Sequence, residues 1–65
     1  MSKRFLRLPQ VMEATGMRRS AIYAGMEHGD FPKSFQIGTR AVAWAEDDID
    51  AWKRAKLEAA GKEFA

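Results

Sequence analysis

Apolar side chains recur at helical spacing in two short segments of the first half of the chain, over residues 9–15 and from about residue 18 to residue 28. Pro9 suits the first position of a helix, because its missing N–H has no partner to lose there. Gly16 and Gly29 each follow the last turn of a segment, where the left-handed conformation that glycine tolerates ends a helix. The pattern therefore predicts two short helices joined by a tight turn.

The second helix has two unlike faces. Ile22 and Met26 form its inward stripe, and the small residues Ala21 and Gly25 beside that stripe favour a close approach to the first helix. The opposite face is polar and largely basic, and it carries Arg19, Ser20, Tyr23 and Glu27.

The period of the pattern changes from helical to two in the second half of the chain. Residues 34–37 and 41–44 alternate between apolar and polar, which predicts a β-hairpin with Thr39 and Arg40 at its tip and Gly38 in a positive-φ turn conformation. A lone hairpin is unstable, so one face must lie on the helices. The candidates for that face are Ile37, Val42 and Trp44, and Phe31 in the preceding turn is a further apolar anchor.

A third helix is predicted from Glu46, because four of its first five residues are acids, at the end where the helix dipole favours negative charge. The helical pattern fades by Gly61. Trp52 is expected to be the largest contributor to the core, on a stripe made by Ile49, Trp52, Ala55 and Ala59.

These elements make one small domain, because 65 residues provide a single marginal core. We expect residues 1–65 to form one domain, with a flexible basic arm at residues 1–5 and a frayed tail at residues 61–65. Leu8 precedes a proline and is expected to be extended. There is no apolar run of membrane-spanning length and no secretory signal, which predicts no membrane partner and a cytoplasmic protein.

The distribution of charge matters more than the net charge of +2. Residues 1–45 hold seven Lys or Arg against three acids, whereas residues 46–65 hold four against six. A basic front with an acidic back favours a polyanionic partner approached from one side, with ordinary surface scatter as the alternative.

Catalytic chemistry finds little support in the sequence. The chain has no cysteine and a single histidine, His28, which suits the last turn of a helix better than a catalytic triad. The acids after Ala45 lack the spacing of a calcium loop, and no glycine-rich phosphate loop is present. We therefore expect no enzyme activity, no metal and no cofactor.

Two short helices joined by a turn that contains glycine are typical of a helix-turn-helix, whose second helix enters the major groove of DNA. An αα-hairpin in an unrelated bundle is the alternative. Arg18 and Arg19 favour the first interpretation, because arginines oppose the dipole at a helix start and local rules are most often broken at functional sites. For Tyr23 the alternative role is packing, and for Arg40 it is a solvated turn.

Five motifs in register give the chain a resemblance to the AlpA family of phage regulators, over roughly residues 5–55. They are Leu6-Arg7-Leu8-Pro9-Gln10-Val11, Thr15-Gly16-Met17-Arg18-Arg19-Ser20-Ala21-Ile22-Tyr23, Gly29-Asp30-Phe31-Pro32-Lys33, Ile37-Gly38-Thr39-Arg40-Ala41-Val42-Ala43-Trp44 and Ile49-Asp50-Ala51-Trp52. The resemblance implies a small α+β winged helix-turn-helix, akin to excisionases and to the MerR-type DNA-binding domain. It also implies recognition-helix roles for Arg19, Ser20 and Tyr23, and wing-tip roles for Thr39 and Arg40.

The expected site comprises residues from the recognition helix, the turn after it and the wing: Arg18, Arg19, Ser20, Tyr23, Lys33, Thr39 and Arg40. Arg18 stands where the family usually has a serine cap, and Ala21 replaces the usual threonine. Ala24 takes a place often held by arginine, so the base preference of relatives does not transfer.

The partner expected from these residues is double-stranded DNA. The function expected is that of an excisionase, or recombination directionality factor, with integrase and a cooperative second copy as further partners. The alternative is a transcriptional regulator of an integrase gene or a neighbouring operon. A more remote alternative is a protein-interaction module that uses the Trp52 helix.

Overall fold

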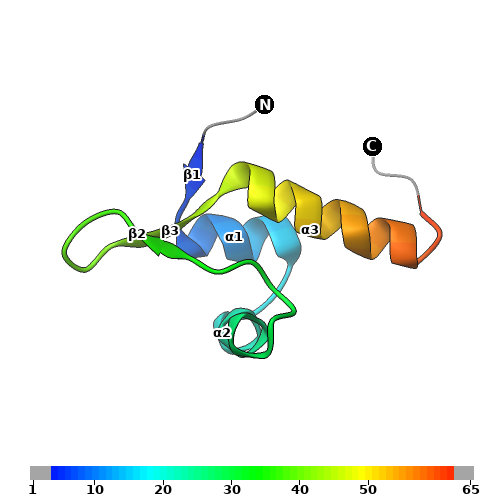
Figure 1. The fold of residues 1–65 in the computed structure, drawn as a ribbon, viewed down its shortest axis with the longest axis horizontal. Coiled ribbons are helices and arrows are strands. Elements are labelled where there is room, and N and C mark those ends of the chain that lie inside the picture. Colours follow the sequence, from blue (N-terminus) through cyan, green and yellow to red (C-terminus); the bar gives the residue numbers. More distant parts are fainter. Residues whose placement is uncertain (1–3, 63–65) are drawn as a thin grey trace.

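The computed structural model describes residues 4–62, which form three helices and a small antiparallel sheet. The elements are β1 (Phe5–Leu6), α1 (Leu8–Thr15), α2 (Arg19–His28), β2 (Phe35–Gln36), β3 (Val42–Ala45) and α3 (Glu46–Ala59). Figure 1 shows the sheet at one end of the molecule, α2 below α1, and α3 running away from the sheet. This is the winged helix-turn-helix arrangement that the sequence predicts.

The sheet has three strands in the order β1-β3-β2, with both neighbours antiparallel to β3. The sequence predicts the β2–β3 hairpin but not β1, because two residues carry too little periodicity to identify a strand. Phe5, expected in a flexible arm, lies opposite Ala45, and Leu6 lies opposite Trp44. Residues 1–3 of that arm and residues 63–65 of the tail are outside the described residues.

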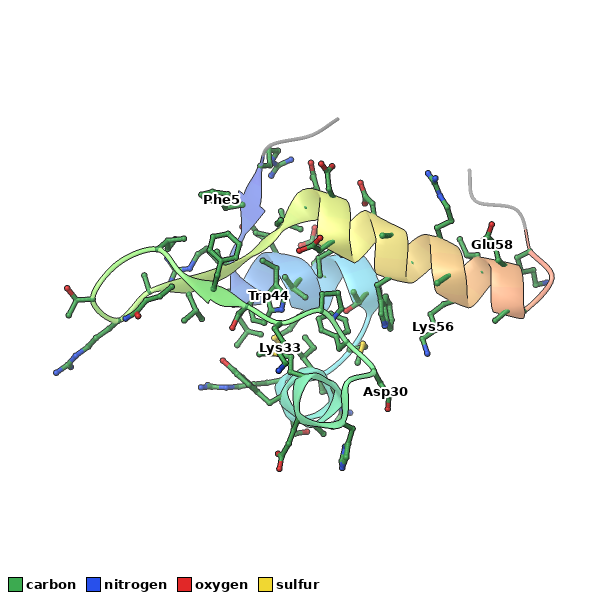
Figure 2. The ribbon with its side chains drawn as sticks, viewed as in Figure 1. Phe5, Asp30, Lys33, Trp44, Lys56 and Glu58 are labelled. Carbon is green, nitrogen blue, oxygen red and sulfur yellow. The ribbon has the colours of Figure 1, made fainter. Side chains whose placement is uncertain are left out.

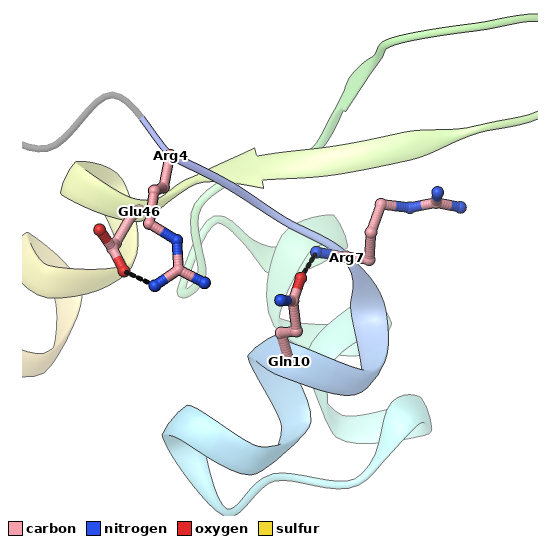
Figure 3. Close-up of polar contacts among 4 residues, drawn as sticks. All are labelled: Arg4, Arg7, Gln10 and Glu46. Carbon is pink, nitrogen blue, oxygen red and sulfur yellow. Dashed lines mark hydrogen bonds and ion pairs between the residues drawn. The ribbon is translucent and has the colours of Figure 1, made fainter.

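Two contacts join the β1 end of the chain to the start of α3, and Figure 3 shows one of them, the ion pair between Arg4 and Glu46. The Glu46 N–H donates a hydrogen bond to the Arg4 carbonyl (2.9 Å), and the Arg4 guanidinium lies 3.6 Å from the Glu46 carboxylate. The ion pair is partly exposed and contributes about 1 kcal/mol at most. The backbone bond, together with the strand pairing, gives the chain a defined path from Arg4 onward.

α1 begins at Leu8, so Pro9 occupies the second helical position rather than the first, and Leu8 is helical rather than extended. The Arg7 N–H donates to Gln10 Oε1 (2.8 Å), which satisfies a backbone donor at the helix start (Figure 3). At the far end of the chain α3 is closed by Gly61 (φ 73°), whose N–H donates to the Glu58 carbonyl. The described part of the predicted frayed tail is therefore capped.

The core lies between the inner face of the sheet and the three helices. Its buried members are Leu6, Val11, Ile22, Phe31, Trp44 and Ile49. The expectation that Trp52 dominates this core is wrong: Trp44 is the largest fully buried side chain, and Trp52 is only half-buried. The reason is that α3 leaves the body of the molecule after its first turns (Figure 1), so Ala55 and Ala59, expected on the buried stripe, are exposed.

Two expectations for the hairpin are also wrong. Ile37 is 42% exposed, because the pairing of Phe35 with Ala43 places residues 35 and 37 on the face opposite Trp44. Gly38 has no positive φ, because the Ile37 N–H donates to the Ala41 carbonyl (2.8 Å) and closes a loop wide enough to turn without it.

Gly25 does permit a close approach, but the partner is Phe31 rather than α1. A Cβ at position 25 would lie 2.9 Å from Phe31 Cβ. The Gly25 carbonyl also accepts the N–H groups of Asp30 (2.8 Å) and Phe31 (3.1 Å), so the chain doubles back tightly after α2. Ala21, which we expected beside the same contact, is exposed.

Candidate nucleic-acid interface

The turn between α1 and α2 is held by side-chain and backbone hydrogen bonds. Thr15 Oγ1 donates to the Val11 carbonyl (2.8 Å) and accepts the Met17 N–H (3.2 Å). Gly16 adopts φ 72°, and its N–H donates to the Met12 carbonyl (2.8 Å). These bonds fix how the chain enters α2, and therefore the direction in which its first turn points.

The first turn of α2 is basic and has no side-chain cap. Arg18 is the N-cap residue, with an extended backbone (φ −82°, ψ 159°), and its side chain accepts no cap hydrogen bond. The first turn contains no acid, and Arg18, Arg19 and Ser20 are all exposed. Backbone N–H groups and the positive end of the helix dipole therefore point outward beside two guanidinium groups, an arrangement suited to a phosphate or another anion.

Tyr23 lies one turn further along the same face. The Arg19 guanidinium carbon is 5.7 Å from the centre of the Tyr23 ring, and Tyr23 is 38% exposed. Residues four apart on a helix are neighbours, and an arginine over a tyrosine ring gains a cation–π attraction. This contact holds the Arg19 side chain along the exposed face of α2.

Lys33 joins this group from the segment between α2 and β2, and Figure 2 shows it next to α2. Tyr23 and Lys33 line one open hollow together with Met26, Glu27 and Ser34. Ser34 was missed by the sequence reasoning, which assigned it to a strand; its position next to Lys33 is the signal that could have identified it.

Thr39 and Arg40 are exposed in the loop between β2 and β3. Gln36 Nε2 donates to the Thr39 carbonyl (2.9 Å), a contribution to the shape of the tip that the sequence reasoning did not foresee. In Figure 1 this loop projects from the sheet end of the molecule, apart from α2. The structure therefore gathers five of the expected site residues around α2 and leaves two on a separate projection.

Other kinds of site are not evident in the described part of the chain. Across residues 4–62, no three His, Asp or Glu side chains gather closely enough to hold a metal ion. None of the helices described there is both long and apolar enough to cross a membrane.

The turn-linked pair α1–α2, the hairpin beside it and the α3 helix behind it define a winged helix-turn-helix regulator, a class whose second helix reads DNA. The model of the family described as "Prophage CP4-57 regulatory protein (AlpA)" matches residues 4–57. The chain belongs to this AlpA family of prophage regulatory proteins.

Two relatives with curated descriptions are similar over most of this chain. One is the "DNA-binding transcriptional activator AlpA" of Escherichia coli (strain K12), 40% identical over 62 residues that cover 83% of this chain and 89% of the relative. The other is the "Uncharacterized protein ORF88" of Enterobacteria phage P4, 38% identical over 55 residues that cover 85% of this chain. The chain spans 62% of the length of that phage protein.

Proposed function

We propose that this chain binds duplex DNA sequence-specifically, with the first turn of α2 in the major groove. The observation that carries the proposal is the exposed, uncapped and basic helix start at Arg18, Arg19 and Ser20. Arginine is the commonest reader of guanine, because its guanidinium donates two hydrogen bonds to the O6 and N7 acceptors. Arg19, held along the helix by Tyr23, is the candidate for that contact.

The flanking residues supply contacts to the DNA backbone. Lys33 and Tyr23 face the same hollow beside α2, where a phosphate would meet an ammonium and a phenol. Thr39 and Arg40 form the wing, which reaches a phosphate or the narrow minor groove. With about four to six phosphate contacts, log K should fall with log salt at a slope of roughly −4 to −5.

Two biological roles are compatible with this binding mode. Regulation of transcription is favoured by the similarity to the E. coli protein, which is described as a DNA-binding transcriptional activator. The excisionase role, with integrase as a partner, is the second candidate. It is supported by the resemblance of the chain's motifs to a family akin to excisionases.

Selection of bound fragments from the DNA of the source genome tests the proposed binding. We expect a recurrent short sequence, bound more tightly than a shuffled duplex of the same length, with affinity that falls steeply with salt. Equal affinity for both duplexes would refute sequence-specific binding, and salt-insensitive binding would refute the basic interface.

A second measurement separates the two roles. A reporter fused to the selected site reports regulation of transcription, and a circular-permutation gel assay on the same site reports bending. Bending together with loss of prophage excision in a deletion strain would favour the excisionase. A changed reporter with normal excision would favour the regulator.

A further inference from the structure

The polar face of α2 carries one acid, and the DNA contacts proposed above do not use it. Glu27 is the only acidic residue between Arg19 and His28, and it is exposed. It follows Arg19 and Tyr23 in the i, i+4, i+8 row of the helix surface. A carboxylate on a surface proposed to meet phosphates needs a reason of its own.

The position of Glu27 opposes the electrostatics of the helix. It lies in the last turn of α2, where the negative end of the helix dipole favours a cation. The first turn is also reversed, because Arg18 and Arg19 stand where the dipole favours acids. In α3 the ordinary order holds, with acids in the first turn and Lys56 in the last. Both ends of α2 therefore carry charges that the helix itself does not favour, and such local conflicts concentrate at functional sites.

Within residues 4–62 no cation forms an ion pair with the Glu27 carboxylate. The residues three or four positions away from it along the chain are not basic: Tyr23, Ala24, Asp30 and Phe31. Lys33 lines the same open hollow as Glu27, but no ion pair joins the two side chains. The Glu27 carboxylate is therefore available to a donor from outside the protein.

The hollow beside α2 is suited to more than a phosphate. Lys33 and Tyr23 attract a phosphate oxygen, whereas Glu27, on the same hollow, repels it. In the major groove a carboxylate finds its donor in an amino group of a base, and cytosine presents one at N4. Glu27 can therefore read a base in the groove while Lys33 contacts the backbone beside it.

The length of α2 determines how far this base lies from the one contacted by Arg19. The two residues are eight positions apart, which is roughly 12 Å along a helix that rises about 1.5 Å per residue. Successive base pairs lie about 3.4 Å apart, so this distance corresponds to roughly three to four base-pair steps. The major groove admits an α-helix, so both side chains can reach base edges.

We propose that Glu27 is a specificity-determining residue that accepts a hydrogen bond from a cytosine amino group, roughly three to four base pairs from the guanine contacted by Arg19. The inference rests on the proposed DNA binding and adds a second base that α2 reads. On a duplex without that cytosine, the carboxylate lies near phosphates and has no donor. Wrong sequences are thereby penalised, which increases specificity without adding affinity for DNA in general.

Selection of bound duplexes from a randomised pool, carried out with wild type, Arg19→Ala and Glu27→Ala, tests the assignment. Each variant should lose the base preference at one position, and the two positions should lie roughly three to four base pairs apart. Titration then compares duplexes with cytosine or thymine at the Glu27 position. Wild type should bind the cytosine duplex about 10-fold more tightly, and Glu27→Ala should bind the two equally.

Glu27→Gln separates base reading from general repulsion. Glutamine has the length of glutamate and pairs with adenine N6 and N7, so the preferred base should change from cytosine to adenine at that position alone. Glu58→Ala, near the far end of α3 (Figure 2), is the matched control. It also removes one exposed acid, and it should keep the wild-type preference at every position.

The outcomes distinguish this inference from the proposed function. A wild-type chain without any base preference refutes sequence-specific binding itself. A wild-type preference that persists in Glu27→Ala, with all duplexes bound more tightly by the same factor, overturns only the role of Glu27 and makes it a source of general repulsion. Loss of folding does not confuse these results, because removing an exposed acid from the negative end of a helix dipole is stabilising. Urea unfolding of Glu27→Ala, at or above the wild-type midpoint, checks this.

Discussion

Arg18→Ser is expected to make the domain more stable and its DNA binding weaker. Arg18 is the N-cap residue of α2, and its backbone is extended. Its carbonyl accepts the Ile22 N–H at 3.1 Å, whereas its side chain forms no capping hydrogen bond. A serine in that backbone conformation accepts an orphan N–H of the first turn, which stabilises a helix by about 1 kcal/mol. Removing a cation from the positive end of the dipole adds about 0.3 to 1 kcal/mol.

The sum, roughly 1 to 2 kcal/mol, is large for a domain of 65 residues, whose total stability is of the order of 3 to 10 kcal/mol. Urea unfolding of wild type, Arg18→Ser and Arg18→Ala separates its two parts. The alanine variant gains only the stability that comes from removing the cation at the helix dipole. The serine variant should therefore be more stable than the alanine variant by the contribution of the cap hydrogen bond. Both variants should lose about one unit of the salt slope if Arg18 contacts a phosphate.

Two results would contradict this reasoning. A serine variant no more stable than the alanine variant would mean that the N–H groups of the first turn already have other partners. A stabilised variant with an unchanged salt slope would remove Arg18 from the DNA interface, leaving its position at the cap unexplained by function.

Three further substitutions test other parts of the molecule. Arg19→Ala should weaken specific binding by about 1 to 3 kcal/mol in a fluorescence titration if it reads a base edge, whereas equal loss on shuffled DNA would make it a phosphate contact. Arg40→Ala should reduce the salt slope by about one unit, and an unchanged slope would remove the wing from the interface. Gly25→Ala should destabilise the domain by about 1 to 2 kcal/mol in urea, because the new Cβ would lie 2.9 Å from Phe31 Cβ and the clash outweighs the gain in helix propensity. Gly38→Ala is its control, since a Cβ there would lie 3.6 Å from Ala41 Cβ; a Gly25 variant as stable as this control would refute the close approach.

The helices were predictable because their signals are local. Gly16 and Gly29 end α1 and α2 in the left-handed conformation, and Glu46 opens α3, as the pattern indicates. Strand pairing joins residues that are far apart in the chain. The place of Phe5 in a third strand therefore produces no periodic pattern in the sequence near it. The inward or outward orientation of Ile37 depends on a register that the loop fixes, and a shift of one residue reverses every side chain on a strand.

The two tryptophans show a different limit of sequence reasoning. Both have the area to dominate a core, and hydropathy does not rank them. Trp44 does so because it lies on the central strand, with Leu6 opposite it and the helices on its face. Trp52 lies where α3 leaves the body of the molecule, so only part of its ring is covered. The Phe31 ring packs edge-on against it, with the two ring centroids 5.0 Å apart.

Both indole groups also bear on the proposed DNA-binding surface, through the segment between α2 and β2. Trp44 Nε1 donates to the Pro32 carbonyl (2.9 Å), and Trp52 Nε1 donates to the Asp30 carbonyl (2.8 Å). Lys33 follows directly, so its backbone is held by the central strand and by α3 at once. Because α2 is tied to the same segment through the Gly25 carbonyl, the lysine and the recognition helix keep a fixed relation. The phosphate contact proposed for Lys33 is thereby positioned by two tryptophans that are not themselves part of the proposed interface.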